Sequence, residues 1–116
     1  MIDDVFCKIV KGELGAEVVY QDNDFWVIKD INPQAPVHLL IIPVKHYNSL
    51  EDFLEEESAL LGKLLLTAHK VAHQAGLAEK GYRLILNEGE YGGKLVPHLH
   101  IHLLGGKKLG PKIVKD

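Results

Sequence analysis

The sequence predicts an α+β domain with a mainly antiparallel sheet, and three observations support this prediction. Segments with the alternating or continuous apolar pattern of strands occur at residues 17–30, 37–46, 82–88 and 98–106. One long segment, residues 49–76, instead has the apolar spacing of a helix. Every connection except this helical one is short, which favours antiparallel hairpins over parallel crossovers.

A short helix and three strands are expected in the N-terminal third of the chain. Residues 4–11 have helical apolar spacing, and the segment GELG ends that helix. Two strands, residues 17–22 and 24–30, are joined by a tight turn. Residues 37–46 are apolar on both faces, so this strand should be central, with Pro43 ending its regular part.

The long helix and two further strands complete the expected fold. The acidic start of residues 49–76 suits a helix N-terminus, and Gly76 is a suitable stop. Its buried stripe is expected to contain Leu61, Leu64, Leu65, Ala68, Ala72 and Ala75. Leu60, Leu64 and Val71 widen this stripe beyond what one small sheet needs, which favours pairing with a second copy. Residues 82–88 and 98–106 are the fourth and fifth strands.

Length, charge and cysteine content exclude several classes of protein. The chain of 116 residues is expected to form one domain over 1–116, with a tail of about 107–116 that is loosely held or packed on a partner. A net charge of −3 argues against a broad grip on a nucleic acid polymer. With the single Cys7, a polar start and no long apolar run, the expectation is a soluble cytoplasmic protein without membrane contact.

The segment HLHIH, residues 98–102, carries the most specific chemistry. Alternation with period two places His98, His100 and His102 on one face of a strand and apolar side chains on the other. Two or three imidazoles on one face can ligate a metal ion, usually with further ligands from elsewhere. They can also perform phosphoryl chemistry, because a neutral imidazole is a nucleophile near pH 7 and its neighbours can stabilise phosphate oxygens.

Neighbouring residues favour the phosphate interpretation. A glycine-rich loop joins Asn87 to His98, and its backbone N–H groups can approach an anion closely. The same glycines, Gly89, Gly92 and Gly93, could also serve only to turn a hairpin. His38 joins the cluster if its strand neighbours the fifth strand. His69 and His73 are expected to face solvent beside the helical stripe.

Three blocks together make the sequence similar to a known family. DINPQAPVH, NEG and HLHIHLL resemble the histidine-triad (HIT) family, in particular its HINT-like purine nucleoside phosphoramidase branch, over about residues 4–106. The resemblance implies a five-stranded antiparallel sheet with one long and one short helix, pairing into a ten-stranded sheet in a homodimer. It also implies hydrolysis of purine nucleoside 5′-phosphoramidates through a covalent nucleotidyl-histidine, without a cofactor.

The resemblance assigns roles to individual residues. His100 would attack the α-phosphorus, His98 and His102 would flank it, and His38 would complete the cluster. Asp30 would accept the ribose hydroxyls, while Asn87 and the Gly93 backbone would hold phosphate. The full nucleotide-binding set, including an apolar slot for the base, is Asp30, Asn87, Gly93, Phe6, Ile9, Ile28, Ile31 and Val96.

The sequence departs from the family pattern at two places. Lys94-Leu95 stands where the branch commonly has Gln-Ser or Gln-Glu, so a hydrogen bond near the leaving group is lost. Lys94 either supplies a point charge there or faces solvent. Some bacterial relatives carry a structural zinc site whose first ligand pair is C-x-x-C. The corresponding residues are Asp4, Cys7, His46 and His98. All four are permissible zinc ligands, but the loss of one thiolate should weaken the site, so the expectation is that no metal is bound.

Other functions remain open at this point. Within the enzymes, the alternative is a dinucleoside polyphosphate hydrolase of the related Fhit-like branch, against which the PQAP block argues. A nucleotide-binding interaction protein with little turnover would not need His100. A structural metalloprotein using the HxHxH face would contain bound metal.

Overall fold

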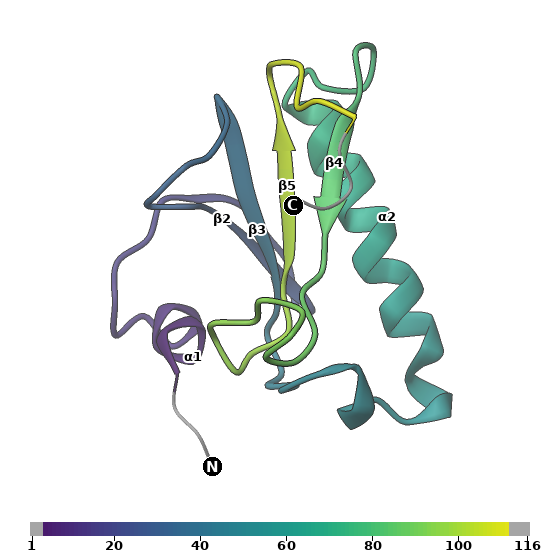
Figure 1. The fold of residues 1–116 in the computed structure, drawn as a ribbon. Coiled ribbons are helices and arrows are strands. Elements are labelled where there is room, and N and C mark those ends of the chain that lie inside the picture. Colours follow the sequence, from purple (N-terminus) through teal and green to yellow (C-terminus); the bar gives the residue numbers. More distant parts are fainter. Residues whose placement is uncertain (1–3, 112–116) are drawn as a thin grey trace.

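The computed structural model describes residues 4–111, which contain a five-stranded antiparallel sheet in the order β1-β2-β3-β5-β4 (Figure 1). The strands are β1 (Val18–Gln21), β2 (Phe25–Lys29), β3 (Val37–Pro43), β4 (Tyr82–Ile85) and β5 (Ile101–Gly105). The helices are α1 (Val5–Val10) and α2 (Ser58–Gln74), with two 3₁₀ turns, η1 (Leu50–Asp52) and η2 (Glu55–Glu57). The predicted fold class is confirmed.

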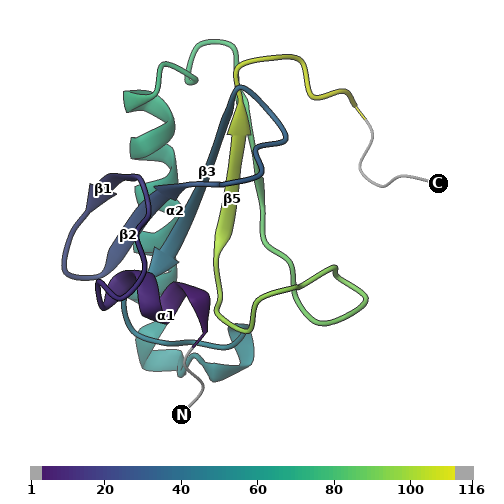
Figure 2. The ribbon, with the colours of Figure 1, turned by 90° about the vertical axis from the view of Figure 1, so that its left-hand side faces the viewer.

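The two helices lie on opposite faces of the sheet (Figures 1 and 2). Helix α2 covers one face, where Leu64, Ala68 and Val71 pack against strand residues in the larger apolar cluster. Helix α1 covers part of the other face, where Phe6 and Ile9 pack on β2 and β3 in a smaller cluster. The second face is less completely covered, and it is the face that carries the histidines.

Strand β3 lies at the centre of the sheet, between β2 and β5, as its continuous apolar pattern predicts. Leu39 and Ile41 face α2, whereas Leu40 and Ile42 face α1. His38 is on the same side as Leu40, because side chains alternate along a strand. Strand β3 pairs with β5, which carries His102. This is the pairing that His38 needs to join the histidine cluster.

The segment before α2 differs from the predicted continuous helix. Residues 49–57 form two 3₁₀ turns, and α2 begins only at Ser58. The Asp52 carboxylate accepts hydrogen bonds from the backbone N–H groups of Asn48 and Ser49, and Glu57 accepts one from Leu54. These acidic side chains favour local turns over a regular helix, because they satisfy backbone donors that a continuing helix would use differently.

The buried stripe of α2 is also rotated relative to the prediction. Leu65 is 55% exposed and Ala75 is exposed, whereas Thr67 and Val71 are buried. Leu64 and Val71 belong to the core, so they do not widen an exposed apolar surface as the sequence suggested. The exposed leucines on this helix are instead Leu65 and Leu66, which lie outside the i, i+3, i+4 stripe set by the core contacts.

Strand β5 is shorter than the predicted residues 98–106. Its regular pairing starts at Ile101, while Leu99 donates its backbone N–H to the Tyr47 carbonyl at 2.6 Å outside the sheet. The alternation of side chains nevertheless holds: Leu99, Ile101 and Leu103 are in the core beneath α2.

Two remaining expectations concern the ends of the chain and the membrane. Within residues 4–111 no helix combines the length and the apolar character needed to cross a bilayer. Of the expected tail, residues 112–116 lie outside the described part of the chain, and Arg83 donates a side-chain hydrogen bond to the Gly110 carbonyl. The single-domain assignment for 1–116 stays a prediction.

Candidate active site

A cavity of about 310 Å³ opens between α1, the β2–β3 loop and the loop joining β4 to β5. His100 and His102 line it together with Asp30 and an otherwise largely apolar wall. The sequence-predicted residues that line it are Phe6, Ile9, Ile28, Asp30, Ile31, Asn87, Gly93, Val96, His100 and His102. Of the predicted residues, only His38 and His98 are absent from the wall. Residues far apart in the chain are thus brought to one place.

His100 has a free nucleophilic nitrogen. Its Nδ1 lies 2.8 Å from the backbone carbonyl of His98, and because a carbonyl can only accept, Nδ1–H is the donor. In the neutral ring, Nε2 therefore keeps its lone pair. The ring packs edge-on against Phe6, with ring centroids 4.9 Å apart, which restrains its orientation. The imidazole is thus held in the tautomer that a nucleophile at Nε2 requires.

His102 has the opposite arrangement, set by a chain of hydrogen bonds through His38. The backbone N–H of Gln34 donates to Nδ1 of His38 at 3.0 Å, so the proton of a neutral His38 is on Nε2. That Nε2–H donates to Nδ1 of His102 at 3.0 Å and is 3.3 Å from the Asp30 carboxylate. The proton of His102 is consequently on Nε2, as a hydrogen-bond donor.

Burial keeps His100 and His102 neutral. Burial is the main reason that the pKa of His100 is lowered; the hydrogen bond to the His98 carbonyl raises this pKa, and the neighbouring His98 ring and Lys94 lower it. The pKa of His102 falls to about 4, again mainly through burial, with His100 and His38 adding to the effect. Near pH 7 the cavity therefore offers an uncharged nucleophile beside an uncharged donor.

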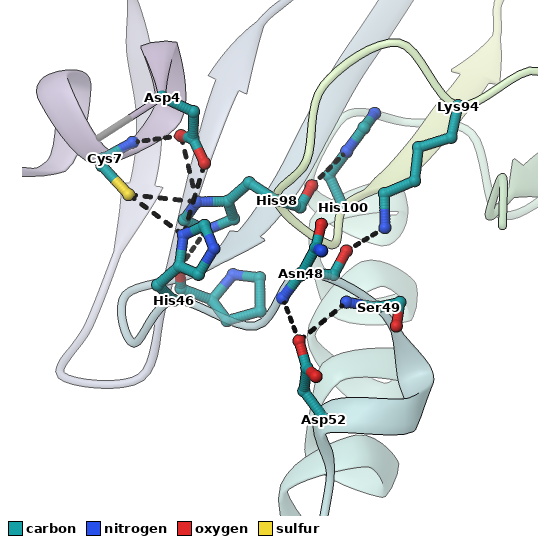
Figure 3. A network of polar contacts seen from close by, with 10 residues as sticks. Asp4, Cys7, His46, Asn48, Ser49, Asp52, Lys94, His98 and His100 are labelled. Atoms are coloured by element: carbon teal, nitrogen blue, oxygen red, sulfur yellow. Dashed lines mark hydrogen bonds and ion pairs between the residues drawn. The ribbon is translucent and has the colours of Figure 1, made fainter. Parts of the chain in front are cut away.

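His98 does not face the cavity. It is fully buried, donates Nε2–H to the Pro43 carbonyl at 3.0 Å, and contributes its own backbone carbonyl to His100 (Figure 3). Its Nδ1 points toward Asp4 and Cys7, and burial lowers its pKa. His98 thus holds the His100 ring through its backbone carbonyl and belongs to a second cluster.

This second cluster, the Asp4 cluster, consists of Asp4, Cys7, His46 and His98 (Figure 3). Nδ1 of His98 is 3.2 Å from Asp4 Oδ1 and 3.5 Å from Cys7 Sγ. Nδ1 of His46 is 3.2 Å from Cys7 Sγ and 3.3 Å from Asp4 Oδ2. Four electron-pair donors from three segments of the chain therefore converge on one point.

The geometry of the Asp4 cluster fits a zinc ion. A tetrahedral ion with ligand bonds of about 2.0–2.3 Å separates its ligand atoms by roughly 3.3–3.7 Å, close to the separations found here. Asp4 Oδ2 is buried without a hydrogen bond, and the Nδ1 lone pair of a neutral His98 faces a carboxylate oxygen. Such an arrangement of acceptors is costly unless a cation or an added proton lies among them.

The phosphate-side residues already have partners within the protein. Gly93, at φ 82°, donates its N–H to the Glu90 carbonyl at 3.0 Å, and the Asn87 amide donates to the Gly92 carbonyl at 2.7 Å. Both residues line the cavity, but the predicted phosphate contact of the Gly93 backbone requires that its turn hydrogen bond be exchanged. Asn87 has a second N–H that can donate to an anion.

Asp30 both caps the loop that follows β2 and lines the cavity. Oδ1 accepts the backbone N–H of Asn32 at 2.8 Å, which is the loop-capping role. Oδ2 lies 3.3 Å from His38 Nε2, and the side chain lines the cavity. A carboxylate has about four acceptor positions, so capping the loop leaves capacity for hydroxyl donors.

The two residues that depart from the family pattern point in different directions. Lys94 neither faces solvent nor lines the cavity: its ammonium donates to the Asn48 carbonyl (Figure 3). It is also 3.9 Å from Glu88. Leu95 is 93% exposed and lines the cavity. The wall thus has an apolar side chain at this position, and the neighbouring positive charge is turned inward.

Sequence reasoning missed several residues of the cavity wall. The additional lining residues are Val5, Lys29, Asn32 and Leu40, whereas Leu95 lines the cavity at the position where the sequence departs from the family pattern. Leu40 could have been found, because it shares a strand face with His38. Val5 could also have been found, because it is four residues before Ile9 on the same helix face. Asn32 and Lys29 had no such periodic signal.

Comparisons with known proteins agree with this geometry. The family model described as HIT domain matches residues 11–109. The purine nucleoside phosphoramidase of Escherichia coli (strain K12) is 45% identical over 109 residues, covering 94% of this chain and 92% of that protein.

Solved structures are similar throughout. A HIT family hydrolase from Clostridium thermocellum is 49% identical with a TM-score of 0.92, covering 98% of this chain and 99% of that one. A histidine triad protein from Clostridium difficile is 40% identical with a TM-score of 0.91, covering 97% of each chain. With its triad histidines in the arrangement described above and the family model matching most of its length, this chain belongs to the HIT domain family.

Proposed function

We propose that this protein is a nucleotide-binding hydrolase that cleaves purine nucleoside 5′-phosphoramidates, and related nucleoside monophosphate conjugates, through a covalent nucleotidyl-histidine. The observation that carries the proposal is His100, a neutral imidazole whose Nδ1–H is fixed on the His98 carbonyl and whose Nε2 is free at the cavity. The 45% identical E. coli relative, named a purine nucleoside phosphoramidase, supports the same substrate class.

In the first step, Nε2 of His100 forms a bond to the α-phosphorus and the bond from phosphorus to the leaving nitrogen breaks. The Nε2–H of His102 donates a hydrogen bond to a phosphoryl oxygen and stabilises the charge that develops there. His102 is not the acid, because its low pKa means that the ring is neutral, and a neutral imidazole is a far weaker acid than imidazolium. The departing amine takes its proton from solvent.

In the second step, water attacks the phosphorus, the bond to His100 Nε2 breaks, and the nucleoside monophosphate leaves. The water loses one proton to solvent and contributes its oxygen to the phosphate. Throughout both steps the Nδ1–H of His100 stays on the His98 carbonyl, so the ring has no alternative orientation to adopt. The proposed reaction uses no cofactor.

The rest of the cavity suits a nucleoside. Phe6, Ile9 and Ile28 give the cavity apolar lining that suits a flat base, and Asp30 can accept ribose hydroxyls. Asn87 lines the same cavity as His100 and can donate an N–H to the phosphate.

The test is hydrolysis of a fluorogenic adenosine 5′-phosphoramidate compared with diadenosine polyphosphates. We expect release of AMP from the phosphoramidate with a kcat/KM about a hundredfold higher or more. A preference for the dinucleoside polyphosphate would assign the chain to the alternative hydrolase class. Tight AMP binding without turnover of either substrate would make it an interaction protein.

The proposal includes a homodimer in which the sheets of two chains are continuous. In the described part of the chain, β4 is an edge strand and Leu65 and Leu66 on the neighbouring helix are 55% and 69% exposed. An unpaired strand edge beside exposed leucines is a surface that a second copy can cover.

The proposal also includes a structural zinc ion held by the Asp4 cluster and a cytoplasmic location. Zinc would supply the cation that the converging lone pairs need and would tie α1 to the histidine segment. It takes no part in the reaction. One cysteine in the whole chain is consistent with a reducing compartment.

A further inference from the structure

We propose that Lys94 is a positioning residue: its ammonium fastens the loop between β4 and β5, residues 86–100, onto the segment 44–57 and thereby holds the cavity wall and His100 in place for the reaction. This inference rests on the proposed function. It concerns a residue that the sequence marks only as a departure from the family pattern.

The ammonium group of Lys94 is directed into the protein. The side chain is only 10% exposed and donates to the Asn48 carbonyl (Figure 3). Its ammonium also lies 3.9 Å from a Glu88 carboxylate oxygen. Lysine is rarely buried unless its charge is paired. The chain therefore holds this cation in a specific place instead of leaving it in solvent.

Glu88 extends the same attachment. Its two carboxylate oxygens each lie 3.3 Å from the backbone N–H of Leu50, which opens η1. Lys94 and Glu88 are at opposite ends of the glycine-rich turn, so both ends of that turn are tied to residues 48–50. The ion pair between the two side chains closes the arrangement.

The receiving segment is itself well held. Asp52 accepts the backbone N–H groups of Asn48 and Ser49, and the Tyr47 hydroxyl donates to Glu57 at the end of η2. The Tyr47 carbonyl also accepts the N–H of Leu99 at 2.6 Å, immediately before His100. The Asn48 carbonyl that Lys94 uses therefore lies next to the contact that fixes the nucleophile's own backbone.

The opposite side of the same loop forms the cavity wall. Gly93 and Leu95, the neighbours of Lys94, both line the cavity, as do Asn87 and Val96. Along this stretch the side chain of Lys94 points inward while its neighbours face the substrate. A shift of Lys94 would consequently move the groups proposed to meet the phosphate and the leaving group.

Apolar packing holds the two ends of the loop, with Leu86 and Leu99 in the larger cluster and Val96 in the smaller one, so the part that depends on Lys94 is the turn at residues 88–95. Its inner shape is set by a glycine turn, in which Lys94 N–H donates to the Gly89 carbonyl at 3.1 Å and Gly93 has φ 82°. At Gly92 a Cβ atom would lie 2.1 Å from the Glu88 carbonyl oxygen, so only glycine fits. Such a turn is compact but brings no apolar anchor, and the large side chains Tyr91 and Leu95 are almost fully exposed. The charged contacts of Lys94 and Glu88 are what join the turn to the rest of the protein.

The experiment compares Lys94→Met with Lys94→Arg, and uses Lys80→Met as the matched control because Lys80 is an exposed lysine away from the cavity. For each protein we measure kcat and KM with the adenosine phosphoramidate, the Kd for AMP, and hydrogen exchange of the backbone amides of residues 86–100. Glu88→Gln is a second variant, in which one acceptor oxygen for the Leu50 N–H remains and the charge is removed.

For Lys94→Met we expect kcat to fall by about tenfold or more, the Kd for AMP to change by less than about threefold, and loop amides to exchange faster. The split is expected because the proposed contacts to the base and ribose of AMP come from α1, β2 and Asp30, outside the Lys94 loop, and these contacts remain when the phosphate-side loop loosens. Lys94→Arg should recover most of kcat, Glu88→Gln should lie between, and Lys80→Met should equal the wild type.

Two results would overturn the proposal. One is a Lys94→Met protein with kcat within twofold of the wild type or with unchanged exchange in the loop. The other is a parallel loss of kcat, AMP affinity and protection across the whole chain, which would make Lys94 a general stability residue. If wild type itself does not turn over the phosphoramidate, the proposed function fails, while the exchange measurement still tests the role of Lys94. If Lys94→Met does not fold, Glu88→Gln decides by the same criteria.

Discussion

The His100 and His102 rings lie side by side but carry their protons on different nitrogens. The difference originates in the hydrogen-bond partner of each Nδ1. A backbone carbonyl accepts from Nδ1 of His100, whereas Nε2–H of His38 donates to Nδ1 of His102. The first ring is left with a lone pair at Nε2 and the second with a proton there. Two chemically identical side chains thereby become a nucleophile and a hydrogen-bond donor.

Asp30 gives a prediction at this scale, because its carboxylate both caps a loop and lines the cavity. Asp30→Asn retains an oxygen for the Asn32 N–H but loses the charge and one acceptor. Since hydrogen bonds to charged groups contribute about 1.5–3 kcal/mol, we expect AMP binding to weaken by about tenfold or more. The ratio of affinities for AMP and 2′-deoxy-AMP, measured by calorimetric titration, should fall toward one.

Asp30→Ala is the companion variant, since it removes the loop cap as well. It should lose additional thermal stability relative to Asp30→Asn. An unchanged ratio of AMP to 2′-deoxy-AMP affinity in both variants would limit Asp30 to the capping role.

The pKa of His102 predicts how stability depends on pH. It is about 4 in the folded protein against an ordinary value of 6.5, so the unfolded chain binds this proton first. The stability contribution of the neutral ring is complete above about pH 6.5 and is lost as the pH falls toward 4. Urea unfolding of chelator-treated protein should therefore give a lower free energy of unfolding at pH 5 than at pH 8.

His102→Gln provides the control for this prediction, because it removes one titrating ring and should reduce the difference between pH 8 and pH 5. Part of the difference should persist, since burial also lowers the pKa values of His98 and His100. Equal stability of the wild-type protein at the two pH values would contradict the assignment of neutral buried rings.

Among the secondary-structure elements, α1 is the shorter of the two α-helices and lines the cavity. It is only six residues long, yet Val5, Phe6 and Ile9 form part of the cavity wall. Its N-cap residue is Asp4, whose Oδ1 accepts the Cys7 N–H at 2.8 Å. A helix this short is marginal without tertiary support. The Asp4 cluster supplies a second attachment at its start.

Zinc content is therefore a prediction about α1. Protein purified without chelators should contain about one zinc ion per chain, and a strong chelator should lower its Tm. Asp4→Asn keeps a good N-cap residue but replaces an anionic ligand, so it should lose zinc while α1 remains capped. Asp4→Cys should bind zinc more tightly.

The prediction about α1 is checked by elemental analysis and by thermal unfolding with and without added zinc. A wild-type protein with no zinc and a Tm unaffected by zinc addition would mean that hydrogen bonds, and not a metal ion, hold the four side chains of the Asp4 cluster together.

The sequence predicts elements well where the signal is local. The continuous apolar run of residues 37–43 identifies the central strand, and the alternation in HLHIH places Leu99 and Ile101 in the core. The insertion of β5 between β3 and β4 was not predictable, because an apolar pattern specifies which face is buried and not which strand lies alongside.

Two other features were not predictable, because each depends on hydrogen bonds or ion pairs of individual side chains. The turns at residues 49–57 arise because Asp52 and Glu57 bond to nearby backbone groups, which helical periodicity does not reveal. The inward direction of Lys94 depends on Asn48 and Glu88, which are 46 and 6 residues away in the sequence. Most residues of the cavity could be predicted because they belong to the family motif. The groups that hydrogen-bond to these residues could not be predicted, because the motif does not include them.

For the whole molecule, the two faces of the sheet are used differently. The larger apolar cluster under α2 stabilises the fold, while the opposite face carries α1, the histidines and the cavity. This arrangement leaves the β4 edge and the exposed leucines of α2 at the surface. The chain mass is 12.9 kDa, so dimer formation is readily measured.

Sedimentation equilibrium at micromolar concentration should give about twice the chain mass. Leu66→Glu, which places a charge on the exposed apolar part of α2, should shift the protein toward monomer without unfolding it. His73→Glu, also on an exposed position of α2, is a control for added charge. A wild-type protein that sediments at 12.9 kDa would contradict the homodimer.

The central claim, that His100 is the nucleophile, is tested most directly by the turnover of adenosine 5′-phosphoramidate by His100→Ala. Removing the group that forms the covalent bond should reduce kcat by several orders of magnitude, while fold and AMP binding stay close to wild type. Mass spectrometry of wild-type enzyme quenched in alkali during turnover should find the adenylyl group on the peptide that contains His100. A His100→Ala protein that keeps a tenth of wild-type activity would contradict the account.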